Sequence, residues 1–307
     1  MPALIALALL AAQASTPEEE SYGPHGRMEE MVCPVGGEHF RALATGSYST
    51  TGARPDGRPD TYWFMPLPLP VCPSNGLVVF NEFTPAQIAA LTPLIGSAAY
   101  RRLVAGDSTY YRAQWLATRI GMPEERALWM LLAATWQVKP ARGAIGQPLP
   151  SPTKVRLYQQ EFVARVRALP ANPRSPSYIA LFARAANAER ELGHFGNAVA
   201  MLTRMRAWLA HGDRSLWESS ESEPEEWVQF AAALARVVAR HESSAQPLDM
   251  ADEVDATWLC IEPDLPNTAF NRAFCARPQL QERIANARRM RAEAERETPP
   301  ASATPPG

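Results

Sequence analysis

The chain has 307 residues, of which 46% are hydrophobic and 20% are charged, and its formal net charge at pH 7 is −2. This length suits one large domain or two ordinary domains with a proper hydrophobic core. A near-neutral charge balance without a cluster of Lys and Arg gives no electrostatic footprint for nucleic acid, so we predict no nucleic-acid partner.

Residues 1–14, MPALIALALLAAQA, are predicted to be an export signal. The stretch carries no charged side chain, is apolar from Ala3 to Ala12, and ends in the small-x-small pattern of a signal-peptidase site. No later window holds the roughly 20 apolar residues of a membrane-spanning helix. We therefore expect a periplasmic or secreted chain that begins at Ser15 and has no stable membrane anchor after cleavage. The alternatives are a short buried helix, or a true start upstream, because no Lys or Arg precedes the apolar run.

Two segments, MVCPVGGEHF at 31–40 and LPVCPSNGLVVF at 69–80, begin like zinc knuckles of the form C-P-x-C-G. Gly36 and Asn75 stand where the second cysteine of each knuckle is expected. Two such turns that close over one zinc bring their four sulfurs to within about 4 Å of one another. The one cysteine that each turn keeps is therefore expected near bonding range of the other.

We predict that Cys33 and Cys72 form a disulfide that holds the two turns together in place of a metal. Four cysteines in an exported chain favour two disulfides, whereas the same number in a cytosolic chain would favour zinc or free thiols. The sequence thus predicts neither a metal nor a cofactor. The alternative is a metal site in which His39 or Glu38 joins the two cysteines.

The segment between the two turns is punctuated by Gly and Pro. It contains a Pro-Asp-Gly turn at 55–57 and β-forming residues at 62–64. Together with the two degenerate knuckles, these features predict a small, irregular, β-rich module that occupies residues 15–83 and is zinc-ribbon-like.

From Thr84 onward the sequence predicts helices in series. Thr84 is typical of an N-cap, Pro85 of the first helical position, and apolar residues follow at helical spacing. No long stretch alternates with period two, so residues 84–296 are predicted to form a helical repeat-like domain before a disordered, Pro-rich tail at 297–307. The further helices are expected at about 108–120, 124–137, 153–168, 176–192, 195–210, 224–241 and 278–296.

One stretch, residues 183–201, has the spacing of a tetratricopeptide unit. Small residues at Ala186 and Ala198 would let two antiparallel helices approach closely, and Gly193 permits the turn between them. The alternative is a generic helical bundle, because any tight pair of helices favours small residues and glycine.

In a tetratricopeptide-like pair the first helix lines a concave groove. Arg184, Asn187 and Arg190 follow one another at three-residue intervals, so they lie on or near that face. An Asn flanked by Arg can bind a peptide backbone or a carboxylate, which makes these residues the candidate peptide-binding groove. The alternative is that they are ordinary solvated helix positions.

Four features in this order resemble a bacterial family of undetermined function, domain of unknown function 2225: the two degenerate knuckles, VVFNEFTPAQIAAL, YYRAQWLATRIGMPEERALWMLLAATW and ARAANAERELGHFGNAVAML. The resemblance covers roughly residues 31–210. It implies a mainly α fold, with tetratricopeptide-like antiparallel helical pairs behind a small β-rich, zinc-ribbon-like N-terminal module. Gly36 and Asn75 depart from the family pattern, so its metal site is not carried over, and the family implies no activity.

A second disulfide is predicted between Cys260 and Cys275. The segment between them contains two prolines, which break regular helix, and closing a loop of this length stabilises by about 3 kcal/mol in the chain-entropy model. The alternative is two buried free cysteines, because apolar residues would surround them: Trp258, Ile261, Phe270 and Phe274.

Catalytic motifs are missing from the sequence, and we name no catalytic residue. His241-Glu242 begins like the H-E-x-x-H helix of zinc proteases, but position 245 is Ala. We expect an exported, non-catalytic scaffold or protein- or peptide-binding protein with a protein or peptide partner. The alternative is a cell-envelope hydrolase with a motif-free active site, because glycosidase-type acids need no local motif.

Overall fold

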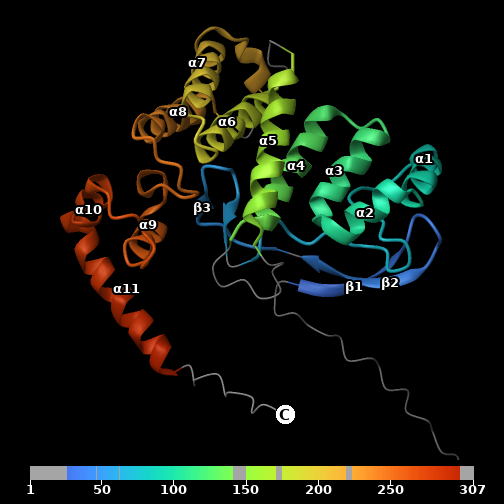
Figure 1. The fold of residues 1–307 in the computed structure, drawn as a ribbon, viewed down its shortest axis with the longest axis horizontal. Helices are drawn as coiled ribbons and strands as arrows, with labels where there is room; N and C mark the ends of the chain where they lie inside the picture. Colours follow the sequence, from blue (N-terminus) through green and yellow to red (C-terminus); the bar gives the residue numbers. More distant parts are fainter. Residues whose placement is uncertain are drawn as a thin grey trace, which may run out of the picture.

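The computed structural model describes residues 26–45, 47–61, 63–140, 150–170, 175–218 and 223–297. Within them the protein is mainly helical, with eleven α-helices and two short antiparallel sheets near the N-terminal end (Figure 1). This confirms the predicted fold class. The predicted export signal lies outside the described residues, and so does the predicted tail except for Glu297, which ends the last helix.

Two small antiparallel sheets make up the β structure of the N-terminal module. The first pairs β1 (Gly26–Val32) with β2 (His39–Thr45), and the first knuckle forms the turn between them. The second pairs β3 (Gly52–Ala53) with β4 (Pro59–Asp60).

The predicted Pro-Asp-Gly turn connects β3 to β4. Gly57 lies in the left-handed region with a φ of 85° and donates its backbone N–H to the carbonyl of Arg54 at 2.7 Å. This short turn projects into the middle of the arc that the helices form (Figure 1).

The first helix begins where the sequence predicts. Thr84 is the N-cap of the first helix, Pro85 is at its start, and Gln87 completes a capping box with Thr84. Three of the helices, α2, α9 and α10, were not expected from the sequence. The bounds are α1 Pro85–Ile95, α2 Ala98–Gly106, α3 Thr109–Arg119, α4 Glu124–Val138, α5 Pro152–Ala168, α6 Pro176–Glu191, α7 Phe195–His211, α8 Pro224–Ala239, α9 Glu253–Leu259, α10 Ala269–Cys275 and α11 Pro278–Glu297.

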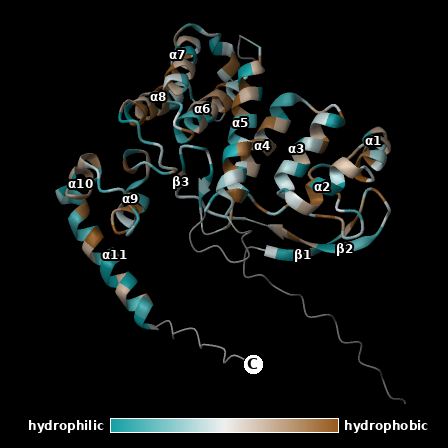
Figure 2. Ribbon diagram, viewed as in Figure 1, coloured by the Kyte–Doolittle hydropathy of each residue, from teal (hydrophilic) through white to brown (hydrophobic). Residues whose placement is uncertain are grey.

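Consecutive helices from α3 to α8 pack against each other and follow an arc (Figure 1). The turn between α6 and α7 has Gly193 at a φ of 81°, and Ala186 and Ala198 are fully buried at the contact of the two helices, as the spacing predicts. The main hydrophobic core runs through α4 to α8, where the apolar residues gather (Figure 2). The assignment to tetratricopeptide repeats stays a prediction.

Two smaller cores flank the main one. The first surrounds the two knuckles and includes Leu77, Leu91 and Tyr100. The second holds α9, α10 and α11 together through residues such as Leu248 and Ile284. Among the described helices, none combines the length and the apolar character that a membrane span needs.

Candidate functional site

The two knuckles have the same backbone geometry. In the first, Cys33 donates its N–H to the carbonyl of Glu38, and Gly37 donates to the carbonyl of Cys33. In the second, Cys72 donates its N–H to the carbonyl of Leu77, and Gly76 donates its N–H to the carbonyl of Cys72. The two cysteines form a disulfide, which we call the knuckle disulfide, with Cα atoms 5.6 Å apart. The predicted pairing is confirmed.

Asn75 replaces the missing cysteine of the second knuckle with hydrogen bonds. Its side-chain amide donates to the carbonyl of Val35 at 2.8 Å, and its oxygen accepts the N–H of Leu77 at 2.9 Å. A Cβ at Gly36 would meet this amide at 3.8 Å, so the glycine lies directly beside it. The two departures from the knuckle pattern are therefore neighbours that join one turn to the other.

Glu38 is the third potential metal ligand beside the two sulfurs, since its carboxylate lies within 4.8 Å of them. This carboxylate accepts hydrogen bonds from the backbone N–H and the hydroxyl of Ser74, at 2.9 and 2.7 Å. His39 begins β2 and is not part of this group. Because the sulfurs are bonded to each other, they present no thiolate, and Glu38 acts as a cap for the second knuckle.

The second predicted disulfide is also present. Cys260 caps the end of α9 and Cys275 ends α10, and their Cα atoms are 5.7 Å apart. We call this pair the C-terminal disulfide. Two disulfides in one chain indicate an oxidising, extracytoplasmic environment.

The predicted groove residues share one face of α6, but the chain itself occupies the space in front of them. Asn187 and Arg190 have no exposed surface, and Arg184 is half-buried. A buried guanidinium needs acceptors, and here the acceptors come from the same polypeptide. These side chains are therefore not accessible to a separate peptide.

The two arginines donate hydrogen bonds to backbone carbonyls of two loops that are far from α6 in the sequence. Arg184 donates to the carbonyl of Pro55 at 2.9 Å, in the turn between β3 and β4. Arg190 donates to the carbonyls of Glu242 and Ser244, at 2.8 and 2.7 Å, in the loop after α8. The arginines thus bind peptide backbone, as their spacing suggests, and that backbone is the chain's own.

A buried ionic cluster lies next to this contact. Lys139, at the end of α4, places its Nζ 2.6 Å from Asp56 and 2.8 Å from Glu191, and all three side chains are at most 7% exposed. Asn187 donates to the Glu191 carboxylate at 2.8 Å and also accepts two hydrogen bonds from Arg190. The cluster fixes the β3–β4 turn against the helices.

The charge state of this cluster argues for a structural role. Burial by itself would lower the pKa of Lys139, but the charges of Asp56 and Glu191 outweigh it, and the pKa is raised. A lysine with a raised pKa stays protonated at neutral pH and is no general base.

One histidine has the geometry of a catalytic base. Glu189 is 2% exposed, and its carboxylate contacts His194 Nδ1 at 2.7 Å. The same carboxylate pairs with Arg167 at 2.7 Å, so its charge is already neutralised. Within the part of the chain that the structure describes, no hydroxyl or thiol contacts the other ring nitrogen of His194. The pair therefore lacks the nucleophile of a hydrolase triad.

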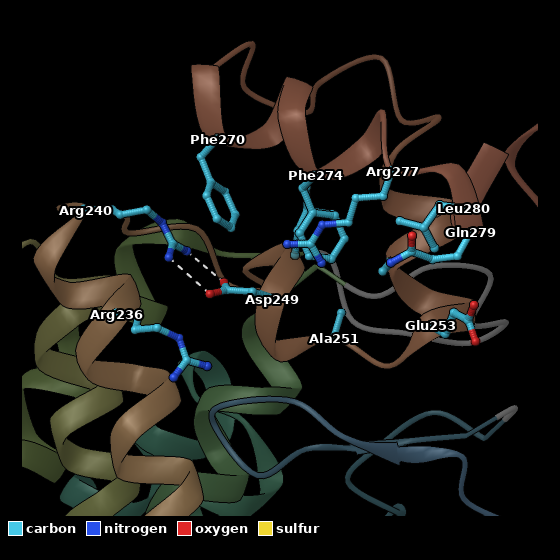
Figure 3. Close-up of a pocket in the computed structure, with 12 residues that line it drawn as sticks. Arg236, Arg240, Asp249, Ala251, Glu253, Phe270, Phe274, Arg277, Gln279 and Leu280 are labelled. Carbon is cyan, nitrogen blue, oxygen red and sulfur yellow. Dashed lines mark hydrogen bonds and ion pairs between the residues drawn. The ribbon is translucent and has the colours of Figure 1, made fainter.

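A cleft of about 600 Å³ lies between α8 and the segment that carries α9, α10 and α11 (Figure 3). Its floor is apolar, since Leu248, Phe274 and Leu280 are at most 8% exposed and belong to the C-terminal core. The C-terminal disulfide joins α9 to α10 and so holds one wall of the cleft in place. This is the candidate site that accessible side chains support.

Three arginines and two carboxylates line this cleft. Arg240 is already paired: it donates two hydrogen bonds to Asp249, at 2.7 and 3.1 Å, and its guanidinium lies 3.8 Å from the centre of the Phe270 ring. Burial lowers the pKa of Arg240, but hydrogen bonds to Asp249 and Glu242 outweigh it and raise the pKa. Glu253, the other carboxylate, pairs with Arg283 at 3.1 Å.

The other two arginines keep their charges available. Arg236 and Arg277 are exposed, and neither has an ion pair or a side-chain hydrogen bond within the described residues. Arg277 stacks its guanidinium 3.9 Å from the centre of the Phe274 ring, which holds it over the cleft. Arg236 points into the cleft from α8, on the opposite side (Figure 3). The cleft therefore presents two free cations around an apolar floor.

Sequence reasoning did not find this cleft. Its residues come from five separate stretches of the chain, none of which has a motif. Phe270 and Phe274 were noticed only as apolar neighbours of the second cysteine pair. Their four-residue spacing, followed by an arginine before a helix-starting proline, was the available signal.

Comparisons with protein-family models, with curated proteins and with solved structures found no match to this chain. The resemblance to domain of unknown function 2225 accordingly stays a prediction.

Proposed function

We propose that this chain is a periplasmic or secreted, non-catalytic scaffold that binds a protein or peptide partner. The observation that carries the proposal is the cleft between α8 and the C-terminal helices, where Arg236 and Arg277 face an apolar floor and neither is paired with a carboxylate of the described residues. Such a combination of free cations, aromatic rings and buried aliphatic side chains suits recognition of a polypeptide. The two disulfides support the extracytoplasmic part of the proposal.

The way the cleft is built also favours a binding function. The wall that α9, α10 and α11 form is held together by the C-terminal disulfide and by the ion pair of Arg291 with Glu262 at 2.6 Å. The end of α8 is linked to this segment by the ion pair of Arg240 with Asp249 at 2.7 Å. Walls that are fixed before the partner arrives lose little conformational entropy on binding.

The test is affinity capture from a cell-envelope extract, with the purified, oxidised chain as bait. We expect a protein that is captured reproducibly by the native chain and is lost with the double variant Arg236→Glu/Arg277→Glu. Arg288→Glu, an exposed site on α11 outside the cleft, is the control for charge and should retain the partner. Absence of any captured protein, or equal capture by the double variant and the native chain, would contradict the proposal.

A further inference from the structure

We propose that the cleft binds an acidic peptide segment in extended form, with carboxylates at both ends of the bound stretch and an apolar or aromatic side chain between them. This inference rests on the proposed binding function and names the chemistry of its partner. It follows from three observations on the cleft: where the free cations lie, what covers the floor, and how the existing carboxylates are used.

The positions of the cations call for an extended ligand. Arg236 enters from α8 and Arg277 from the start of α11, and the two side chains lie on opposite sides of the cleft (Figure 3). Arg240, four residues after Arg236 at the end of α8, adds no free cation, because its guanidinium is already bound by Asp249. A peptide whose carboxylates are separated along its chain can place one carboxylate at each of the guanidinium groups of Arg236 and Arg277.

The floor between the cations calls for an apolar side chain. Phe274 and Leu280 are buried beneath the cleft, and Phe270 presents its ring beside the Arg240 guanidinium. A Phe or Leu side chain placed here would lose contact with water against a preformed apolar surface. The acidic groups then stay at the rim, where the free arginines are exposed.

The chain's own carboxylates do not compete for the two free arginines. Asp249 is bound to Arg240, and Glu253 lies 3.1 Å from Arg283, with both of these side chains 51% exposed. The two arginines without carboxylate partners therefore favour a negatively charged ligand. A neutral or basic peptide would leave Arg236 and Arg277 unpaired and gains nothing from them.

The experiment measures fluorescence anisotropy of labelled Gly-Glu-Glu-Phe-Glu-Glu-Gly with the oxidised full chain at low salt. A matched peptide with Gln at each Glu position tests the charge. We expect the acidic peptide to bind and the Gln peptide to bind at least about tenfold more weakly, because two charge-assisted pairs are absent. Arg236→Ala and Arg277→Ala should each weaken binding by about tenfold, and raising the salt concentration should weaken it further.

Arg288→Ala removes the same charge from an exposed position of α11 outside the cleft and should leave the affinity unchanged. All three side chains are exposed, so we expect each variant to keep the fold, and thermal unfolding of each variant checks this. Equal binding of the acidic and the Gln peptides overturns the inference and leaves the binding function standing. An equal loss of affinity with Arg288→Ala shows general electrostatic attraction and also overturns it. If the native chain binds no acidic peptide, the inference fails, and the capture experiment decides the proposed function separately.

Discussion

Replacing Lys139 by Met should destabilise the protein more than any surface charge change. Its Nζ lies 2.6 Å from Asp56 and 2.8 Å from Glu191, and the three side chains are 5%, 7% and 6% exposed. Methionine fills a similar volume but leaves the buried Asp56 without its cation, and it leaves Glu191 with only the more distant guanidinium of Arg190, at 3.9 Å. Removing one partner from a buried ion pair costs about 3–5 kcal/mol, so we expect a loss of this size in the free energy of unfolding.

The control is Arg283→Ala, which breaks the exposed pair with Glu253. Both of those side chains are 51% exposed, and such pairs contribute at most about 1 kcal/mol. Urea unfolding followed by tryptophan fluorescence measures both variants under the same conditions. A loss below about 1 kcal/mol for Lys139→Met, equal to that of the control, would refute the view that the cluster is dry and that Lys139 neutralises it.

The pH dependence of the Lys139 contribution has a definite sign. Burial lowers the pKa of Lys139, but the charges of Asp56 and Glu191 outweigh burial and raise the pKa above 10.5 in the folded protein. The contribution of Lys139 to the free energy of unfolding is therefore fully present below that pH and is lost as the pH rises above it. We expect the deficit of Lys139→Met to shrink when the pH is raised above 10.5. A deficit that stays unchanged there would contradict this assignment of charges.

Three further predictions concern the zinc content of the chain, its export and its two disulfides. Elemental analysis of the purified, oxidised chain should find no stoichiometric zinc, and one zinc per chain would overturn the disulfide as the replacement for a metal. Mass spectrometry of the exported protein should show Ser15 as the first residue, whereas a retained Met1 would contradict the predicted signal. Replacing both cysteines of the knuckle disulfide by Ser should lower the free energy of unfolding by about 4 kcal/mol, and the same change in the C-terminal disulfide by about 3 kcal/mol, because the first closes the longer loop. Urea unfolding of the two double variants checks both values, and a larger loss for the C-terminal pair would contradict the loop-length reasoning.

Local turn chemistry made the knuckles predictable. A Cys-Pro start and a glycine at the end fix the backbone of each turn, and the equivalence of the two turns follows from sequence alone. The role of Asn75 could not be predicted in the same way. Its amide reaches Val35, which is 40 positions away, so this contact forms only after the two turns meet.

Helices with a local start signal were also predictable, whereas short helices that depend on packing were not. Thr84 with Pro85, and Pro224 with the acidic residues after it, mark helices that the structure confirms. The helices α9 and α10, with seven residues each, were missed. Helices this short are unstable alone, and here they form because they pack around a shared core and are joined by the C-terminal disulfide.

The sequence by itself determined which side chains share a face. Three-residue spacing places Arg184, Asn187 and Arg190 together on α6, and the structure has them there. Only the tertiary structure decided what they bind, because Arg184 meets Pro55 across 129 positions of the chain. The cleft has the same origin: Arg236 and Arg277 line one cleft because α8 and the helices α9 and α10 all contact residues 248–250. Periodicity sets the direction of a side chain within its own helix, whereas its partner depends on long-range packing that no local pattern encodes.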